Sequence, residues 1–166
     1  THGLEWIFPE VAVAHPFDNS SPALLYKDIN KTAATLGEDE DAYKSLFKPL
    51  VEGWDDIAKT FLGPLRIPSD IPLATKFGLK AIRPAKSLAQ SAFKGEKARG
   101  MFAGLAAHSI MPLENITTSA IGLMLGLLGH HINWPVPKGG SQSLADALAN
   151  YFQSIGGEIK TDFEVR

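Results

Sequence analysis

The sequence predicts an α+β protein that is predominantly helical, and three patterns support this. Apolar residues alternate near the start of the chain, as in short strands. From position 28 to about 128 they recur at spacings of three and four, as on amphipathic or buried helices. The last 26 residues read as a helix, a glycine turn and a strand, which together form half of an α/β unit.

The first strands lie within residues 4–13 and 23–26. Leu4, Trp6 and Phe8 recur at every second position, and apolar residues return at 23–26 after the turn-forming stretch 18–22. Prolines within this region limit the strands to short lengths or to the edge of a sheet.

A short helix is predicted over 28–36, with Asp28 as its N-cap and Gly37 at its C-terminal end. A longer helical pattern follows the acidic run 38–41 and extends to position 62, with its apolar residues on one broad face. The acidic run complements the helix dipole, which explains it better than a metal site does. Pro49 predicts a kink or break near Lys48.

Three further helices are predicted over 70–82, 84–93 and 96–110. Apolar residues are expected to bury one side of each, and the residues concerned are Leu73, Phe77, Ile82, Leu88, Phe93, Met101, Phe102, Leu105 and Ile110.

The segment 116–128 is apolar or small nearly all the way round, so it is predicted to lie in the interior. Its length of about 13 residues is too short to span a bilayer, which requires about 20. Gly122, Gly126 and Gly129 form one stripe, which indicates close helix packing or, as the alternative, contact with a flat ligand.

The C-terminal segment contains the strongest pattern in the chain. An extended linker at 135–137 and a Gly139-Gly140 turn precede a helix that Ser141 or Ser143 is predicted to cap. A second glycine pair ends this helix at about 156. Strict alternation from Glu158 to Val165 then predicts a strand, with Ile159, Thr161, Phe163 and Val165 on one face.

Composition narrows the classes of protein. The formal net charge of −2 gives no basic excess, which argues against a nucleic-acid-binding protein. Cysteine is absent, so neither a disulfide framework nor a thiolate metal site can form, and a cytoplasmic location is expected. Because the first residue is Thr1 rather than Met and the last residues read as a strand, we expect the chain to be an internal piece of a larger protein.

No local pattern assembles catalytic machinery. Cysteine and the Gly-x-Ser-x-Gly elbow are both absent, so no nucleophile is joined to a base, and no catalytic residue is assigned. The five histidines lack ligand spacing, so no metal site is predicted; His108 is expected at a helix end. The Gly-x-Gly-x-x-Gly phosphate-binding pattern is also absent.

Several motifs resemble those of phytoene-desaturase-like and amine-oxidase-like flavoproteins. The principal one consists of Pro137-x-Gly139-Gly140, Leu144, Leu148, Gly156-Gly157-x-Ile159 and Val165. Phe8-Pro9 and the stretches 46–50, 102–109 and 134–137 are similar to the phytoene-dehydrogenase-related branch. The resemblance covers almost the whole chain, and its principal motif is specific to the superfamily rather than to one reaction.

This resemblance implies that residues 1–135 belong to a helical substrate-binding cap and that residues 136–166 return to an FAD-binding domain. It implies FAD as the cofactor of the parent enzyme, with Val165, Gly139 and Gly140 near the cofactor. The family's dinucleotide fingerprint is absent, so this chain alone is not expected to retain FAD or to turn over substrate. The implied substrate is apolar, and the candidate residues for its pocket are Ser141, Gln142, Met101, Phe102, Leu105, Met124 and His131.

Two alternatives remain open at this point. The chain is either a free-standing helical module that binds an apolar ligand or a protein partner, or an oligomerisation domain. The expected partners of the flavoenzyme piece are an apolar small molecule and the remainder of the FAD domain, with no nucleic acid. A homo-oligomer and a peripheral contact with a membrane are both compatible with the sequence.

Overall fold

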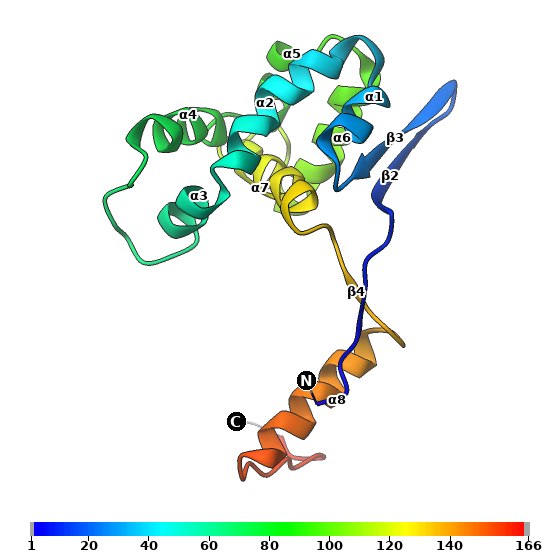
Figure 1. The fold of residues 1–166 in the computed structure, drawn as a ribbon, viewed down its shortest axis with the longest axis vertical. Helices are drawn as coiled ribbons and strands as arrows, with labels where there is room; N and C mark the ends of the chain where they lie inside the picture. The colour runs from blue at the N-terminus through cyan, green and yellow to red at the C-terminus, as the bar shows by residue number, and fades with distance from the viewer. Residues whose placement is uncertain (1, 165–166) are drawn as a thin grey trace. The chain divides into compact units, whose positions relative to one another are not determined.

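The structure is a computed structural model that describes residues 2–164, and the chain divides into two compact units (Figure 1). Unit 1 combines Thr1–Pro9 with Trp134–Arg166, and unit 2 is the continuous stretch Glu10–Asn133. Unit 2 therefore lies, in sequence, between the two segments of unit 1. The division after Asn133 is close to the predicted one after residue 135, but the first nine residues group with the C-terminal segment rather than with the helices.

The predicted fold class, α+β and predominantly helical, is confirmed. In unit 2 the helices are α1 Ile29–Ala34, α2 Glu40–Glu52, α3 Trp54–Phe61, α4 Ile71–Ala81, α5 Ala85–Ala92, α6 Glu96–Ala106 and α7 Thr118–His131, with short 3-10 turns at Gly37–Asp39 and Ala107–Ser109. Its strands are β2 Val11–Phe17 and β3 Ser20–Tyr26. Unit 1 contains β1 Trp6–Ile7, β4 Val136–Pro137 and α8 Ser141–Ser154.

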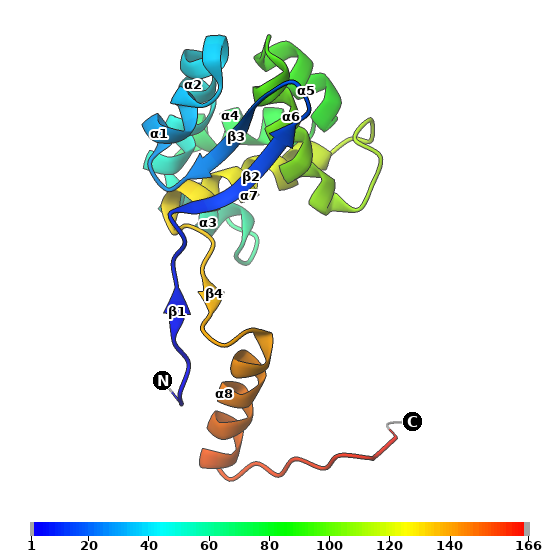
Figure 2. The ribbon, with the colours of Figure 1, turned by 90° about the vertical axis from the view of Figure 1, so that its right-hand side faces the viewer.

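Strands β2 and β3 form an antiparallel hairpin that lies alongside α6 and α7 (Figure 2). Short strands form in both predicted regions, but their bounds differ. The region 4–13 is divided between β1 and the start of β2, which extends to Phe17, and β3 begins at Ser20, three residues earlier than predicted, so that the turn is limited to 18–19. Pro16 and Pro22 fit within the strands because a two-stranded sheet leaves one side of each strand without a ladder partner. Thr32 of α1 fixes the end of the hairpin, since its hydroxyl accepts from the Tyr26 amide at 2.8 Å and lies 3.1 Å from the Tyr26 carbonyl.

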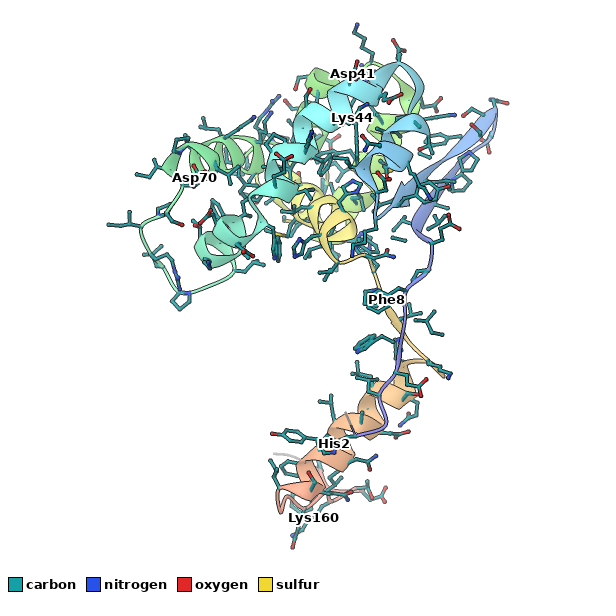
Figure 3. All side chains as sticks on the ribbon, in the orientation of Figure 1. His2, Phe8, Asp41, Lys44, Asp70 and Lys160 are labelled. Atoms are coloured by element: carbon teal, nitrogen blue, oxygen red, sulfur yellow. The ribbon has the colours of Figure 1, made fainter. Side chains whose placement is uncertain are left out.

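The predicted helix cap at Asp28 is confirmed, and Asp70 caps α4 in the same way. The Asp28 carboxylate accepts from the Asn30 amide at 2.8 Å at the start of α1. At the start of α4, where Figure 3 labels it, Asp70 accepts from the Leu73 amide at 2.8 Å. In each case a carboxylate satisfies one of the amide groups that the first helical turn leaves without a backbone partner.

A kink or break was predicted near Lys48, and the break does not occur. Helix α2 continues through Pro49 and ends at Glu52, and Gly53 separates it from α3. Proline removes one intrahelical donor, but the helix persists here because its buried face, which includes Phe47 and Leu50, is held by the core. The exposed face carries acidic and basic residues, among them Asp41 and Lys44 (Figure 3). The Lys44 Nζ atom lies 3.6 Å from Asp41 Oδ1.

The buried faces of the next three helices largely match the prediction. Phe77, Leu88, Phe93 and the middle of α6 are buried. Ile110 is an exception: it is 92% exposed, because α6 ends at Ala106 and the chain turns through a 3-10 segment into a left-handed conformation at Ile110. Two other residues that were predicted to be buried are not: Ile82 is exposed and Leu73 is half-buried.

Helix α7 occupies the centre of unit 2, where its glycines allow neighbouring helices and the hairpin to approach closely (Figure 1). Gly122 faces Phe102 of α6, Gly126 faces Phe47 of α2, and Gly129 faces a leucine of β3. Side chains of the protein itself thus fill the space beside the three glycines, as expected if the glycine stripe serves close helix packing.

In unit 1, β1 pairs antiparallel with β4, with Trp6 opposite Pro137 and Ile7 opposite Val136. The predicted turn at Gly139 and Gly140 is confirmed, with a positive φ at both glycines, and it leads into α8. The predicted serine cap of α8 is wrong, because Gly140 occupies the N-cap position and no side chain caps the helix.

The predicted strand after α8 is also wrong for the residues that the structure describes. Residues 158–164 adopt no strand, and neither sheet includes them. A single extended segment gains ladder hydrogen bonds only from a neighbouring strand, and the described chain places none beside it. Val165 lies outside the described residues.

Candidate functional site

Unit 2 contains a cleft of about 660 Å³, which is within the range of small-molecule sites. It is formed by the end of β2, the exposed sides of α5 and α6, and the loop that precedes α7. The lining residues are Phe17, Lys86, Ala89, Gln90, Lys94, Glu96, Arg99, Gly100, Ala103, Leu113 and Glu114.

The loop wall of the cleft is attached to α5 by three hydrogen bonds. The Lys86 amide donates to the Leu113 carbonyl at 3.1 Å, and the Lys86 ammonium group contacts Glu114 at 3.0 Å. The buried hydroxyl of Thr118 accepts from the Ala85 amide at 2.8 Å and donates to the Asn115 carbonyl at 2.8 Å. This wall is therefore held by backbone and buried side-chain bonds, not by its surface ion pair alone.

A buried carboxylate positions the start of α6. Asp39 is 1% exposed and accepts from the amides of Lys94 at 2.8 Å and Gly95 at 2.6 Å. Charge-assisted hydrogen bonds of this kind are about twice as strong as neutral ones. Asp39 thereby fixes the backbone from which the Lys94 side chain reaches the cleft.

The apolar floor depends on the close approach of Phe17 to α6. A Cβ atom at Gly100 would lie 2.8 Å from the Phe17 ring, so only glycine lets the ring rest on this helix. Ala89 and Ala103 extend the floor with short side chains, and Leu113 closes it from the loop. The floor is therefore apolar and shallow, with longer charged side chains around it.

The charged rim is not fully neutralised within the protein. Lys86 pairs with Glu114, and this hydrogen bond is the main reason why the pKa of Glu114 lies below its usual value. Arg99 uses its Nε–H to donate to the Phe93 carbonyl at 2.9 Å, which orients the guanidinium group. Among residues 2–164 neither Arg99 nor Lys94 forms an ion pair, and Glu96 is the remaining acidic residue at the rim.

A second polar cluster is buried between α2 and α7. The Tyr43 hydroxyl lies 2.7 Å from His130 Nε2, and His130 Nδ1 lies 3.3 Å from the Lys27 carbonyl. Since a carbonyl only accepts, Nδ1 carries the proton in neutral His130, and Nε2 accepts from Tyr43. Burial raises the pKa of Tyr43 and lowers the pKa of His130, so both groups remain neutral at pH 7. The cluster therefore acts as a neutral, hydrogen-bonded link between α2 and α7.

His15 lies on β2 against Gly104 of α6. Its buried Nδ1 has no hydrogen-bond partner within residues 2–164. Burial, and to a smaller extent the charge of His108, lower the pKa of His15. His108 lies at the end of α6, as predicted, in the 3-10 turn that follows the helix, and its Nδ1 is 3.3 Å from the Gly104 carbonyl.

The predicted pocket residues of unit 2 do not gather at the cleft. Met101, Phe102 and Leu105 are buried in the core. Met124 is half-buried on α7, and the ring of His131 stacks on the Trp54 ring with centroids 5.0 Å apart. None of these five lines the cleft described above.

In unit 1, the Gly139-Gly140 turn and the first residues of α8 are exposed. Both glycines have positive φ, and a Cβ atom at Gly140 would meet nothing within 4 Å, so the backbone there is open to a ligand. Ser141 is exposed at the first position of α8, and the Gln142 amide donates to Asp146 at 2.8 Å.

Sequence reasoning missed the cleft because its residues come from four separate segments. The only local signal is the spacing Lys94-x-Glu96-x-x-Arg99, which places Glu96 and Arg99 on one side of a helix that begins just after Lys94. A charged face of this kind is common on exposed helices and does not indicate a cavity without knowledge of what packs beside it.

Within residues 2–164 no three histidine, aspartate or glutamate side chains come together as a metal site would require. None of the helices described has the length and apolar character needed to cross a membrane. A scan against protein-family models and searches of curated proteins and of solved structures found no match to this chain.

Proposed function

We propose that this chain forms the substrate-side helical part of an FAD-dependent oxidoreductase that acts on an apolar substrate, with unit 1 belonging to the FAD-binding domain. The observation that carries the proposal is the division of unit 1. Its two segments lie on either side of unit 2 in sequence, yet they pair through β1 and β4. A helical domain inserted into another domain is the arrangement that the resemblance to phytoene-desaturase-like enzymes implies.

The surface of α8 supports a larger domain around unit 1. Leu148 and Ile155 are 61% and 64% exposed, and Tyr151 and Phe152 are about half exposed. These four residues recur at three- and four-residue spacing, so they form one apolar helix face that the described chain leaves uncovered. The occupant that fits this proposal is the remainder of the FAD domain, whose sheet would pack against this face.

The residues present could hold only a small part of the cofactor. Gly139 and Gly140 expose backbone in front of an uncapped helix, which is compatible with a nearby flavin nucleotide. The chain lacks the glycine fingerprint that would bind the pyrophosphate. When bound, the flavin would accept a hydride from the substrate. The helices of unit 2 would shape the substrate cavity and exclude water from it.

The experiment is to purify the protein encoded by the whole reading frame that contains this chain and to record its visible absorption spectrum. The proposal expects the bands of oxidised flavin, together with their loss in the isolated 166-residue chain. A colourless protein that also fails to take up added FAD would overturn the proposal.

Two variants sharpen this experiment. Gly140→Val places a branched side chain at the open backbone near the cofactor and should lower flavin occupancy. Gly156→Val is the matched control, because Gly156 also has positive φ, with open space around its Cβ position, at the other end of α8. Equal flavin occupancy in the two variants would contradict the assignment of Gly139 and Gly140.

A second candidate function is a free-standing module that binds an apolar ligand, and the cleft of unit 2 is the observation that favours it. This function requires no flavin. A colourless protein that binds apolar ligands at the cleft would support it over the oxidoreductase. If the α8 face were instead covered by a second copy of the chain, the mass in solution would increase with concentration.

A further inference from the structure

The cleft of unit 2 combines two surfaces of different chemistry. Its floor is apolar and is formed by Phe17, Ala89, Ala103 and Leu113. Its rim carries charged side chains, of which only Lys86 and Glu114 neutralise each other, at 3.0 Å. A ligand that satisfies both surfaces must therefore have an apolar body and a charged group.

The sign of that charge follows from the rim residues that remain unpaired. Among residues 2–164 Lys94 and Arg99 form no ion pair, and the cleft lining carries more cations (Lys86, Lys94 and Arg99) than carboxylates (Glu96 and Glu114). The guanidinium group of Arg99 is also oriented, and the backbone of Lys94 is fixed. The backbone at Lys94 is held by the buried carboxylate of Asp39, and the Arg99 Nε–H is bonded to the Phe93 carbonyl at 2.9 Å. An oriented guanidinium group favours a planar anion such as a carboxylate, because its N–H groups match two oxygens.

The walls of the cleft are held in place without a ligand. Phe17 rests on Gly100, where any side chain would collide with the ring, and the Leu113 carbonyl is bonded to the Lys86 amide at 3.1 Å. A site that is formed in advance loses less entropy on binding than one that must be ordered by its ligand.

We propose that this cleft binds a small amphipathic carboxylate. Its apolar body lies on the floor between Phe17 and Leu113, and its carboxylate is held by Arg99 and Lys94. The volume of about 660 Å³ suits a molecule of this class. The inference goes beyond the proposed oxidoreductase function, because binding here requires neither a flavin nor any residue of unit 1.

The test is calorimetric titration of the full chain with decanoate below its micellar concentration. Three further probes are compared with decanoate. Decanol lacks the charge, decyltrimethylammonium carries the opposite charge, and acetate lacks the apolar body. We expect saturable binding of decanoate with a stoichiometry of one and at least about tenfold weaker binding of the other three, as expected from the loss of a charge-assisted hydrogen bond or of the buried chain. Equal binding of decanol or decyltrimethylammonium would show general apolar adsorption, and equal binding of acetate would show a simple anion site; each would overturn the proposal.

Variants locate the site. Arg99→Gln should weaken decanoate binding about tenfold and leave decanol binding unchanged. Lys59→Gln, which removes a lysine of α3 that does not line the cleft, should leave both unchanged. Because Arg99→Gln also loses the bond to Phe93, Ala103→Met provides a second variant that keeps every charge and fills the floor, and it should weaken decanoate binding too. Wild-type affinity in folded Arg99→Gln and Ala103→Met proteins would overturn the proposal.

Discussion

The position of Gly126 gives the sharpest test of how unit 2 is packed. A Cβ atom added there would lie 2.6 Å from Cε1 and 2.8 Å from Cζ of Phe47. The Phe47 ring has little room to retreat, because it is fully buried and packs against the rings of Tyr43 and His130, whose centroids lie 4.6 Å and 6.0 Å from its own. Gly126→Ala therefore forces either the ring or the α2–α7 spacing to change.

Two opposing effects determine how much Gly126→Ala changes the free energy of unfolding. Alanine in a helix interior is more stable than glycine by roughly 0.5–1 kcal/mol. Overpacking a close-packed core costs about 1–3 kcal/mol. The expected net effect for Gly126→Ala is a loss of about 0.5–2 kcal/mol in the free energy of unfolding. The matched control is Gly78→Ala in α4, where the new Cβ meets nothing within 4 Å, and this variant should gain roughly 0.5–1 kcal/mol.

The assay is urea unfolding of the full chain followed by far-UV circular dichroism, which is dominated by the helices of unit 2. The two variants should move the urea concentration at the midpoint of unfolding in opposite directions. The dependence of the free energy of unfolding on urea concentration should change little. If Gly126→Ala proved as stable as Gly78→Ala, the close contact of α7 with Phe47 would be refuted.

Three further predictions concern buried polar groups, each measured by thermal or urea unfolding. Tyr43→Phe leaves His130 Nε2 without a donor and should cost about 1–3 kcal/mol, whereas an unchanged midpoint would contradict the bond between them. Burial lowers the pKa of both His130 and His15 below the ordinary value of about 6.5, so the unfolded chain binds protons first as the pH falls. The stability that these two histidines confer should thus be fully present above about pH 6.5 and decline below it. An unfolding midpoint that does not change between about pH 7.5 and 5.5 would count against their burial. Asp39→Ala removes the acceptor for two amides and should cost about 1.5–3 kcal/mol, whereas a loss below about 0.5 kcal/mol would show that Asp39 does not position α6.

Features that depend on a few neighbouring residues could be predicted from the sequence. Asp28 caps its helix because a carboxylate reaches the amide two residues ahead, whatever the rest of the fold does. The glycine turn before α8 and the apolar character of α7 also follow from local composition.

Features that depend on distant segments could not be predicted in this way. Pro49 remains inside α2 because burial of that helix outweighs one missing hydrogen bond. The alternating residues 158–164 form no strand because the described chain supplies no strand beside them. The cleft arises only when Phe17, α5, α6 and the loop at Leu113 come together, and neither their spacing nor their composition indicates that meeting.

The pairing of β1 with β4 also has a consequence for the order of folding. These are the first and last strands within residues 2–164, and unit 2 lies between them in sequence. During synthesis β1 must therefore wait for its partner until the whole of unit 2 has left the ribosome. Closing so long a loop between unfolded ends carries an entropic cost that grows with its length. Unit 2 has its own core and can fold first, shortening the flexible chain that separates the two strands. A mutation that slows folding of unit 2 should therefore delay the formation of unit 1 as well.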